Sequence, residues 1–209
     1  MKLPILSLFF FFLTFFVFFA GGDFQNKCSK YFQRRFAYKA DSYRWIHRAS
    51  NLYVDDMPAD GLPYYAQLKA QFLAGNSKFD PPPPPIYFSL VHKIFHPDED
   101  GFKVAEEMYQ TGADYPFYCK EPPEEARQKY SQFTQLIWRS TKKIAFGCDD
   151  NQKTGERHSA IITWEEPGNQ KGDYTNNVLP HEGCNVGHWG YRGEAVFNKT
   201  KTADAAAES

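Results

Sequence analysis

Helix-like and strand-like patterns are segregated along this chain, and their order constrains the fold more than any other feature. Apolar side chains recur at helical spacing in residues 24–48, 62–74 and 101–111. Short apolar runs typical of strands follow in residues 143–148, 159–164 and 174–179. The chain does not alternate strand, helix and strand, as a parallel sheet requires. The order therefore predicts an α+β sandwich.

Residues that disfavour helix mark where we expect the three helical segments to break or end. We expect the first to break near Asp41, the second to end at Gly75-Asn76 and the third to stop at Gly112. A run of five prolines, residues 81–85, lies between the second and third segments and takes polyproline II geometry. We interpret the proline-rich insertion at about residues 76–92 as a stiff surface spacer; a proline-ligand motif is the alternative.

Residues 1–22 have the pattern of a secretory signal peptide. Lys2 precedes an apolar run with small residues behind it, which predicts cleavage before Asp23. An uncleaved anchor is the alternative, because the run is near the lower length limit for crossing a bilayer. We therefore expect a secreted, extracellular domain at residues 23–190, with no stable membrane span after cleavage. The polar tail at residues 191–209 is expected to be flexible.

An even number of cysteines suits an oxidising compartment. The four cysteines predict two disulfide bonds whose pairing stays open, and four buried free thiols are the alternative. They are Cys28, Cys119, Cys148 and Cys184. The sequon at Asn198 is a candidate glycosylation site in a secreted chain. A formal net charge of −1 gives no strong attraction to nucleic acid, so we expect no nucleic-acid partner.

Residues 131–141 read SQFTQLIWRST and resemble the signature of the CAP superfamily, the cysteine-rich secretory, antigen-five and pathogenesis-related proteins. Further matches follow in the family's order: Tyr43-Arg44-x-x-His47, Ala66-Gln67, Val104 to Met108, Pro167-Gly168-Asn169 and Asn177 to Pro180. The resemblance implies a three-layer α–β–α sandwich with a central antiparallel sheet. We expect most of these motif residues to have a structural role rather than a catalytic or ligand-binding one.

The resemblance also implies a cleft in which two His and two Glu can hold a zinc ion. Carried over to this chain, the four positions are His96, Glu106, Lys120 and Gln132, with His92 as the alternative to His96. A protonated Lys cannot ligate zinc, and Gln is a poor ligand for it. We therefore expect no cofactor, and no zinc bound at micromolar metal. Lys120 is expected either to pair with Glu106 or to point to solvent.

Candidate catalytic groups are few. The chain has no Gly-x-Ser-x-Gly elbow, and Ser131 lacks a neighbouring His. An acid–base pair formed by His96 and Glu106 is the remaining alternative. The spacing His181-x-x-Cys184-x-x-x-His188 is a second candidate for metal binding, although Cys184 is expected to form a disulfide.

These patterns predict a secreted, non-enzymatic CAP-type domain that acts as a binding module. The resemblance implies sterols, other lipids or an extracellular protein as its partners. Two alternatives stay open. One is a degenerate metal-dependent hydrolase of the same fold, and the other is a structural extracellular protein that uses the proline run as a spacer.

Overall fold

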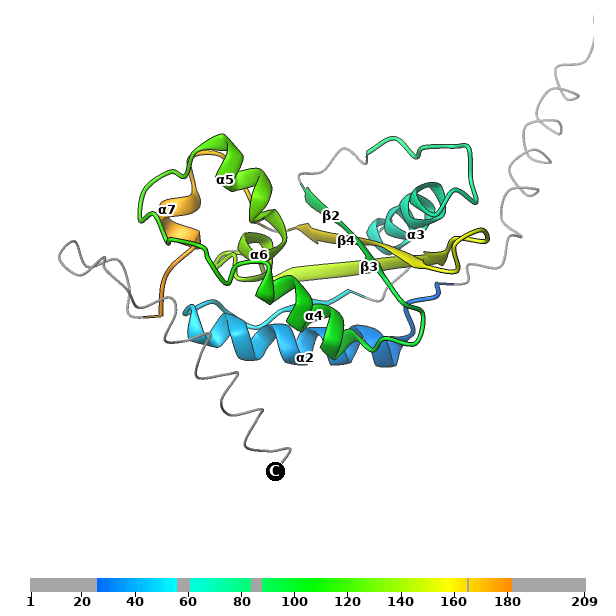
Figure 1. Ribbon diagram of the computed structural model, residues 1–209, viewed down its shortest axis with the longest axis horizontal. Coiled ribbons are helices and arrows are strands. Elements are labelled where there is room, and N and C mark those ends of the chain that lie inside the picture. Colours follow the sequence, from blue (N-terminus) through cyan, green and yellow to red (C-terminus); the bar gives the residue numbers. More distant parts are fainter. Residues whose placement is uncertain (1–25, 56–60, 84–87, 165, 182–209) are drawn as a thin grey trace, which may run out of the picture.

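The computed structural model of the protein describes residues 26–55, 61–83, 88–164 and 166–181 (Figure 1). Several predictions concern residues outside these ranges: the signal peptide at residues 1–22, Cys184, the sequon at Asn198 and the tail at residues 191–209. Within the described ranges, no helix is both long enough and apolar enough to cross a membrane.

A four-stranded sheet lies in the middle of the molecule (Figure 1). In spatial order its strands are β1 (Tyr53–Val54), β3 (Lys143–Asp150), β4 (Arg157–Trp164) and β2 (Phe88–Phe95). The three long strands pair antiparallel, which confirms the predicted antiparallel sheet, whereas the short β1 pairs parallel with β3. β3 and β4 lie where strands were expected. β2 was not foreseen, because its first half falls inside the range interpreted as the proline-rich insertion.

The helices of the described ranges are α2 (Lys30–Ile46), α3 (Leu62–Leu73), α4 (Gly101–Gln110), α5 (Glu124–Lys129), α6 (Ser131–Leu136) and α7 (Tyr174–Asn177). α3 and α4 confirm two expected helices. α2 begins later than expected, where the Ser29 hydroxyl accepts a hydrogen bond from the Phe32 backbone at 3.1 Å. The expected break near Asp41 is wrong. The carboxylate of Asp41 accepts from the Leu52 backbone at 2.7 Å and does not compete with the helix's own bonds.

The strand expected at residues 174–179 is also wrong, because the chain there forms the one-turn helix α7. Local hydrogen bonds explain the difference. The Asn177 side-chain amide donates to the Asp173 carbonyl at 3.0 Å, and the Val178 backbone donates to the Tyr174 carbonyl at 2.9 Å. Such side-chain-to-backbone bonds compete with a strand ladder.

Helices cover both faces of the sheet, as the three-layer prediction requires. α2 and α4 lie on one face and α3 lies on the other (Figure 1). The side chains of β3 alternate accordingly: Ile144 and Phe146 join the core under α2, whereas Ala145 joins the core under α3. At Gly147 an added Cβ would lie 2.1 Å from the Ala66 backbone, so only glycine allows α3 to approach this closely.

A disulfide bond between Cys28 and Cys148 ties the segment before α2 to β3, with a sequence separation of 120 residues. Asn26 strengthens the same junction. Its side-chain amide donates to the Phe146 carbonyl at 2.7 Å, and its Oδ1 accepts from the Cys148 backbone at 3.2 Å. Cys119 is also disulfide-bonded, and none of the described cysteines is free. The alternative of free thiols is therefore wrong for these three cysteines.

Replacing Cys28 and Cys148 together by serine is expected to lower the free energy of unfolding by about 2–5 kcal/mol, because the unfolded chain gains entropy when a long loop opens. Urea denaturation of the purified chain measures this change. Lys153→Ala, an exposed change in the turn between β3 and β4, is the control and should leave the midpoint unchanged. A double serine variant as stable as the wild type would contradict a stabilising role for this bond.

Candidate functional site

Side-chain hydrogen bonds hold two of the signature segments together. The Thr134 hydroxyl donates to Asn169 Oδ1 at 2.6 Å, and Asn169 Nδ2 donates to the Ser131 carbonyl at 2.8 Å. Gly168 lies so close to Gln135 that an added Cβ would be 2.3 Å from the Gln135 amide nitrogen. These contacts fix the turn after β4 onto α6. The motif residues involved therefore act as scaffold.

Arg44 is a buried cation that holds α2 against the segment between α6 and β3. Its Nε donates to the Ser50 carbonyl at 2.7 Å. Its two terminal nitrogens donate to the carbonyls of Leu136, Trp138 and Thr141, at 2.9, 2.9 and 2.6 Å. Burial lowers the pKa of Arg44 to about 10, so the guanidinium stays charged at neutral pH. Four carbonyl dipoles stabilise this charge, which makes Arg44 a structural clamp.

His47 follows the C-terminal end of α2 and lies buried among aromatic rings. Its Nδ1 lies 2.7 Å from the Leu179 carbonyl oxygen, and its Nε2 lies 3.1 Å from the Tyr109 hydroxyl. Burial lowers the pKa of His47 to about 4, so the ring is neutral at pH 7. In that state Nδ1–H donates to Leu179, and Nε2 accepts from Tyr109. Both nitrogens are engaged and shielded from solvent, which suits packing rather than acid–base chemistry.

The four positions carried over from the family do not meet in one place. His96 follows β2, and its side chain is 67% exposed, with Nδ1 3.4 Å from the Asp98 carboxylate. Gln132 lies on α6 at the other end of the sheet, where Gln135 donates to Thr163 opposite the start of β2. An eight-residue strand spans about 23 Å. His96 and Gln132 are therefore too far apart to hold one metal ion.

Glu106 lies on α4 and has its partners on α2. The Tyr43 hydroxyl donates to Glu106 Oε1 at 3.4 Å, and Lys39 Nζ is 3.6 Å from the same oxygen. Lys120 is exposed, and no hydrogen bond or ion pair in the described ranges joins Glu106 to Lys120 or to His96. The described part of the chain also holds no group of three or more His, Cys, Asp or Glu suited to a metal ion.

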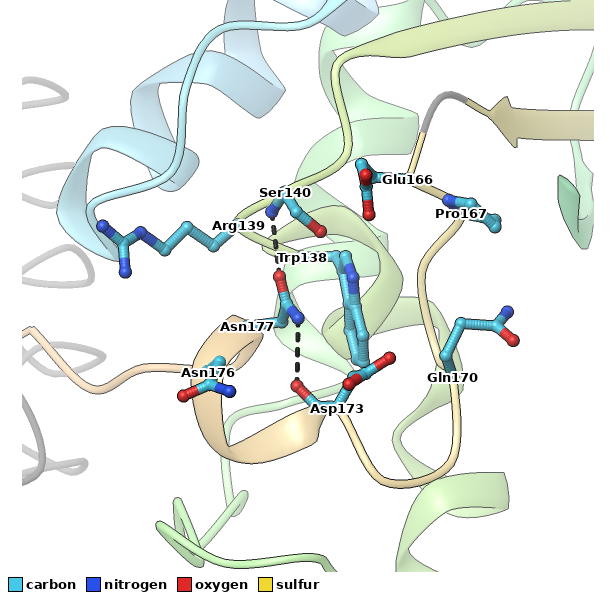
Figure 2. A pocket seen from close by; sticks show the side chains of 9 residues that line it. All are labelled: Trp138, Arg139, Ser140, Glu166, Pro167, Gln170, Asp173, Asn176 and Asn177. Atoms are coloured by element: carbon cyan, nitrogen blue, oxygen red, sulfur yellow. Dashed lines mark hydrogen bonds between the residues drawn. The ribbon is translucent and has the colours of Figure 1, made fainter. Parts of the chain in front are cut away.

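A cavity of about 500 Å³ lies beside α7 (Figure 2). Polar and charged residues outnumber apolar ones in its lining, which consists of Trp138, Arg139, Ser140, Glu166, Pro167, Gln170, Asp173, Asn176 and Asn177. Asn177 organises this wall, because its Oδ1 accepts from the Ser140 backbone at 2.9 Å and its Nδ2 donates to the Asp173 carbonyl at 3.0 Å. The described residues of the lining include no His or Cys. Sequence reasoning missed this cavity, because the motif residues that line it were interpreted as scaffold.

The outer side of α2 carries a row of exposed aromatic side chains that was not recognised from the sequence. Tyr31, Tyr38 and Trp45 are 67%, 74% and 79% exposed. They follow one another at intervals of seven residues, so they lie along one side of the helix. Two exposed arginines lie near them: Arg34 on α2, and Arg48 just beyond the end of the helix, where its φ is 59°. We call these five residues the α2 row.

The layers and the joined signature segments define a small α–β–α sandwich domain. Comparison with solved structures finds several that are similar to it. The crystal structure of NaASP2 with Zn2+ has a TM-score of 0.47 and 12% identity, over 68% of this chain and 83% of that chain. The hookworm platelet inhibitor has a TM-score of 0.46 and 15% identity, over 70% and 77%. Venom allergen-like protein 4 of Schistosoma mansoni has a TM-score of 0.44 and 12% identity, over 67% and 90%.

These solved structures are structures of the CAP superfamily, the family that the sequence motifs resemble. No family model matches this chain, and the comparison with curated proteins finds no match. At such identities and TM-scores the likeness transfers no ligand, activity or partner to this chain.

Proposed function

We propose that this chain is a secreted, non-enzymatic CAP-type binding protein that attaches to a lipid surface through the α2 row. One observation carries the proposal. Tyr31, Tyr38 and Trp45 are each more than half exposed along one side of a helix whose other side is packed in the core. The fourteen-residue interval from Tyr31 to Trp45 corresponds to about 21 Å along the helix axis. Aligned exposed rings of this kind are typical of an interaction surface.

The side chains of the α2 row match the interface between lipid headgroups and acyl chains. Tyr and Trp place an apolar ring and a polar edge at that depth. Arg34 and Arg48 add positive charge, which attracts anionic headgroups. At a membrane surface, the aliphatic part of an arginine side chain lies along apolar groups while its charged end stays in water. The row contains no long aliphatic side chain, so we expect shallow and reversible attachment.

A lipid surface fits this chain better than a sterol held in the cavity beside α7. Arg139, Glu166 and Asp173 line that cavity, and burying such groups against a sterol is unfavourable. A protein partner is the second candidate, since Tyr, Trp and Arg also dominate protein interfaces. The α2 row favours the membrane because its three rings lie along one exposed side of a helix, so a flat bilayer surface can contact all three together.

Two features support a non-enzymatic role. His47 is buried with both ring nitrogens engaged, and His96 and Glu106 have separate partners in Asp98 and Lys39. EDTA-sensitive turnover of an ester or peptide substrate by the purified chain would overturn this part of the proposal and favour the hydrolase alternative. The structural-protein alternative predicts that the chain engages neither lipid nor substrate.

Co-sedimentation with vesicles tests the lipid attachment. The wild type is expected to bind phosphatidylcholine vesicles that contain phosphatidylserine, and to bind phosphatidylcholine alone more weakly. Tyr38→Ser combined with Trp45→Ser should weaken this binding about tenfold or more, which corresponds to about 1.4 kcal/mol. Tyr64→Ser is the matched control, because it removes a half-exposed tyrosine from α3 in the opposite layer.

Three other outcomes would count against this proposal. Binding that requires cholesterol in the vesicles would indicate a sterol ligand. Equal binding by the wild type and the double variant would contradict the role of the α2 row. No vesicle binding, together with a cross-link from position 38 to an extracellular protein, would favour a protein partner.

A further inference from the structure

Two histidine side chains meet on the sheet face that carries α3. His92 lies on β2 and His158 on the neighbouring strand β4. His92 pairs in register with Ala160, two residues beyond His158, so both imidazoles lie on one face. Ala160 pairs in turn with Gly147, which contacts α3. His92 Nε2 is 3.2 Å from His158 Nδ1, and the ring centroids are 5.2 Å apart.

This spacing fits two ligands of one metal ion. Two nitrogens that each lie about 2.0–2.1 Å from a tetrahedral zinc ion are separated by about 3.3–3.4 Å. In a tetragonal copper site, two adjacent nitrogens at the same distance are separated by about 2.9 Å. The observed 3.2 Å lies between these values. Without a metal the two rings share a hydrogen bond. With a metal, the donating ring holds its proton on its other nitrogen.

The surroundings favour a cation. Partial desolvation of the ring, and then the neighbouring His158, lowers the pKa of His92, which favours the neutral imidazole that binds metals. Asp149 on β3 lies opposite His158 in the register and on the same face. Its carboxylate accepts a hydrogen bond from Asn76 at 2.9 Å, just beyond the C-terminal end of α3. A carboxylate and a helix C-terminus both contribute negative potential there.

The two histidines differ in their access to solvent. His158 is 8% exposed and is fixed by packing, whereas His92 lies exposed on the edge strand β2. An incoming ion can therefore reach the pair from the side of His92. No third His, Cys, Asp or Glu of the described residues completes the group, so water is expected to fill the remaining coordination positions.

From this geometry we infer that His92 and His158 form a site for one divalent transition-metal ion, held by two imidazoles and water. Copper(II) binds more tightly than zinc at a nitrogen site of this kind. His92 was the alternative to His96 among the positions carried over from the family, but its partner here, His158, is not one of those positions. The site lies on the opposite face of the sheet from α2, so it is independent of the proposed lipid attachment.

Titration calorimetry of the full chain, first stripped with a chelator, tests the site with copper(II) and with zinc. One ion per chain is expected to bind. His92→Gln should weaken copper binding about tenfold or more and leave the fold intact, because the side chain is exposed. His96→Gln is the matched control. It removes an exposed histidine just beyond the end of the same strand, and should bind copper like the wild type.

Electron paramagnetic resonance of the copper-loaded chain gives a second readout. The wild type should show coupling to two imidazole nitrogens, and His92→Gln should show coupling to one. The absence of saturable binding would overturn the inference. Copper affinity in His92→Gln equal to that of the wild type would overturn it as well, because the ion would then be bound elsewhere in the chain.

Discussion

Replacing Arg44 with methionine is expected to lower the free energy of unfolding by about 4 kcal/mol or more, one of the largest effects of any single substitution in this fold. A methionine side chain fills much of the space that the arginine side chain occupies, but it leaves four backbone carbonyls without their hydrogen-bond donor. Each buried acceptor that loses its partner costs about 1–3 kcal/mol. Urea denaturation followed by circular dichroism measures the change.

Two further variants keep this prediction testable. Arg44→Lys retains the positive charge, but an ammonium group cannot donate to all four carbonyls as the planar guanidinium does. Its free energy of unfolding should therefore lie between those of the wild type and the methionine variant. Arg48→Met alters an exposed arginine four residues away and serves as the matched control. If Arg44→Met unfolded at the same urea concentration as Arg48→Met, the hydrogen bonds of Arg44 would not stabilise the fold as proposed.

Acidification is expected to destabilise the protein through His47. Its pKa is about 4 in the folded state, below the ordinary value of 6.5, because burial opposes the charged ring. The unfolded chain therefore takes up this proton first as the pH falls. The contribution of His47 to stability is fully present above pH 6.5 and is lost progressively down to about pH 4. A shift of this size corresponds to about 3 kcal/mol.

Denaturation at pH 7 and at pH 4.5 measures this loss, and His47→Gln isolates it. The glutamine variant should be less stable than the wild type at pH 7, yet its stability should fall less between the two pH values. His96→Gln should retain the wild-type slope, because that side chain is exposed. Identical slopes in the wild type and in His47→Gln would show that the buried ring does not govern acid stability.

Strong local patterns were enough to predict much of the fold. α3, α4, β3 and β4 follow from apolar spacing and from nearby stop signals, and their order along the chain predicts the α+β class. α7 was missed because the Asn177 side chain bonds back to Asp173 and favours a turn of helix over a strand. The continuity of α2 at Asp41 was missed because it depends on a bond to Leu52, eleven residues further along.

The candidate sites depend on distances that sequence spacing does not reveal. His96 and Gln132 match family positions along the chain, yet the length of β2 separates them. His92 was considered only as an alternative to His96, and its partner His158 emerges only from the register of β2 on β4. The α2 row could have been predicted in part, because the seven-residue interval between its aromatic residues is visible in the sequence. The missing information was which aromatic rings of α2, such as Tyr43, pack inward.

The fluorescence of Trp45 tests the proposed lipid attachment most directly. Trp45 is 79% exposed, whereas Trp138 is buried, so the difference between the wild type and Trp45→Tyr reports on the α2 row. With phosphatidylserine-containing vesicles, we predict that the Trp45 emission shifts to shorter wavelength and becomes protected from an aqueous quencher. Unchanged emission and quenching of Trp45 while the protein co-sediments with those vesicles would show that the protein does not attach through the α2 row.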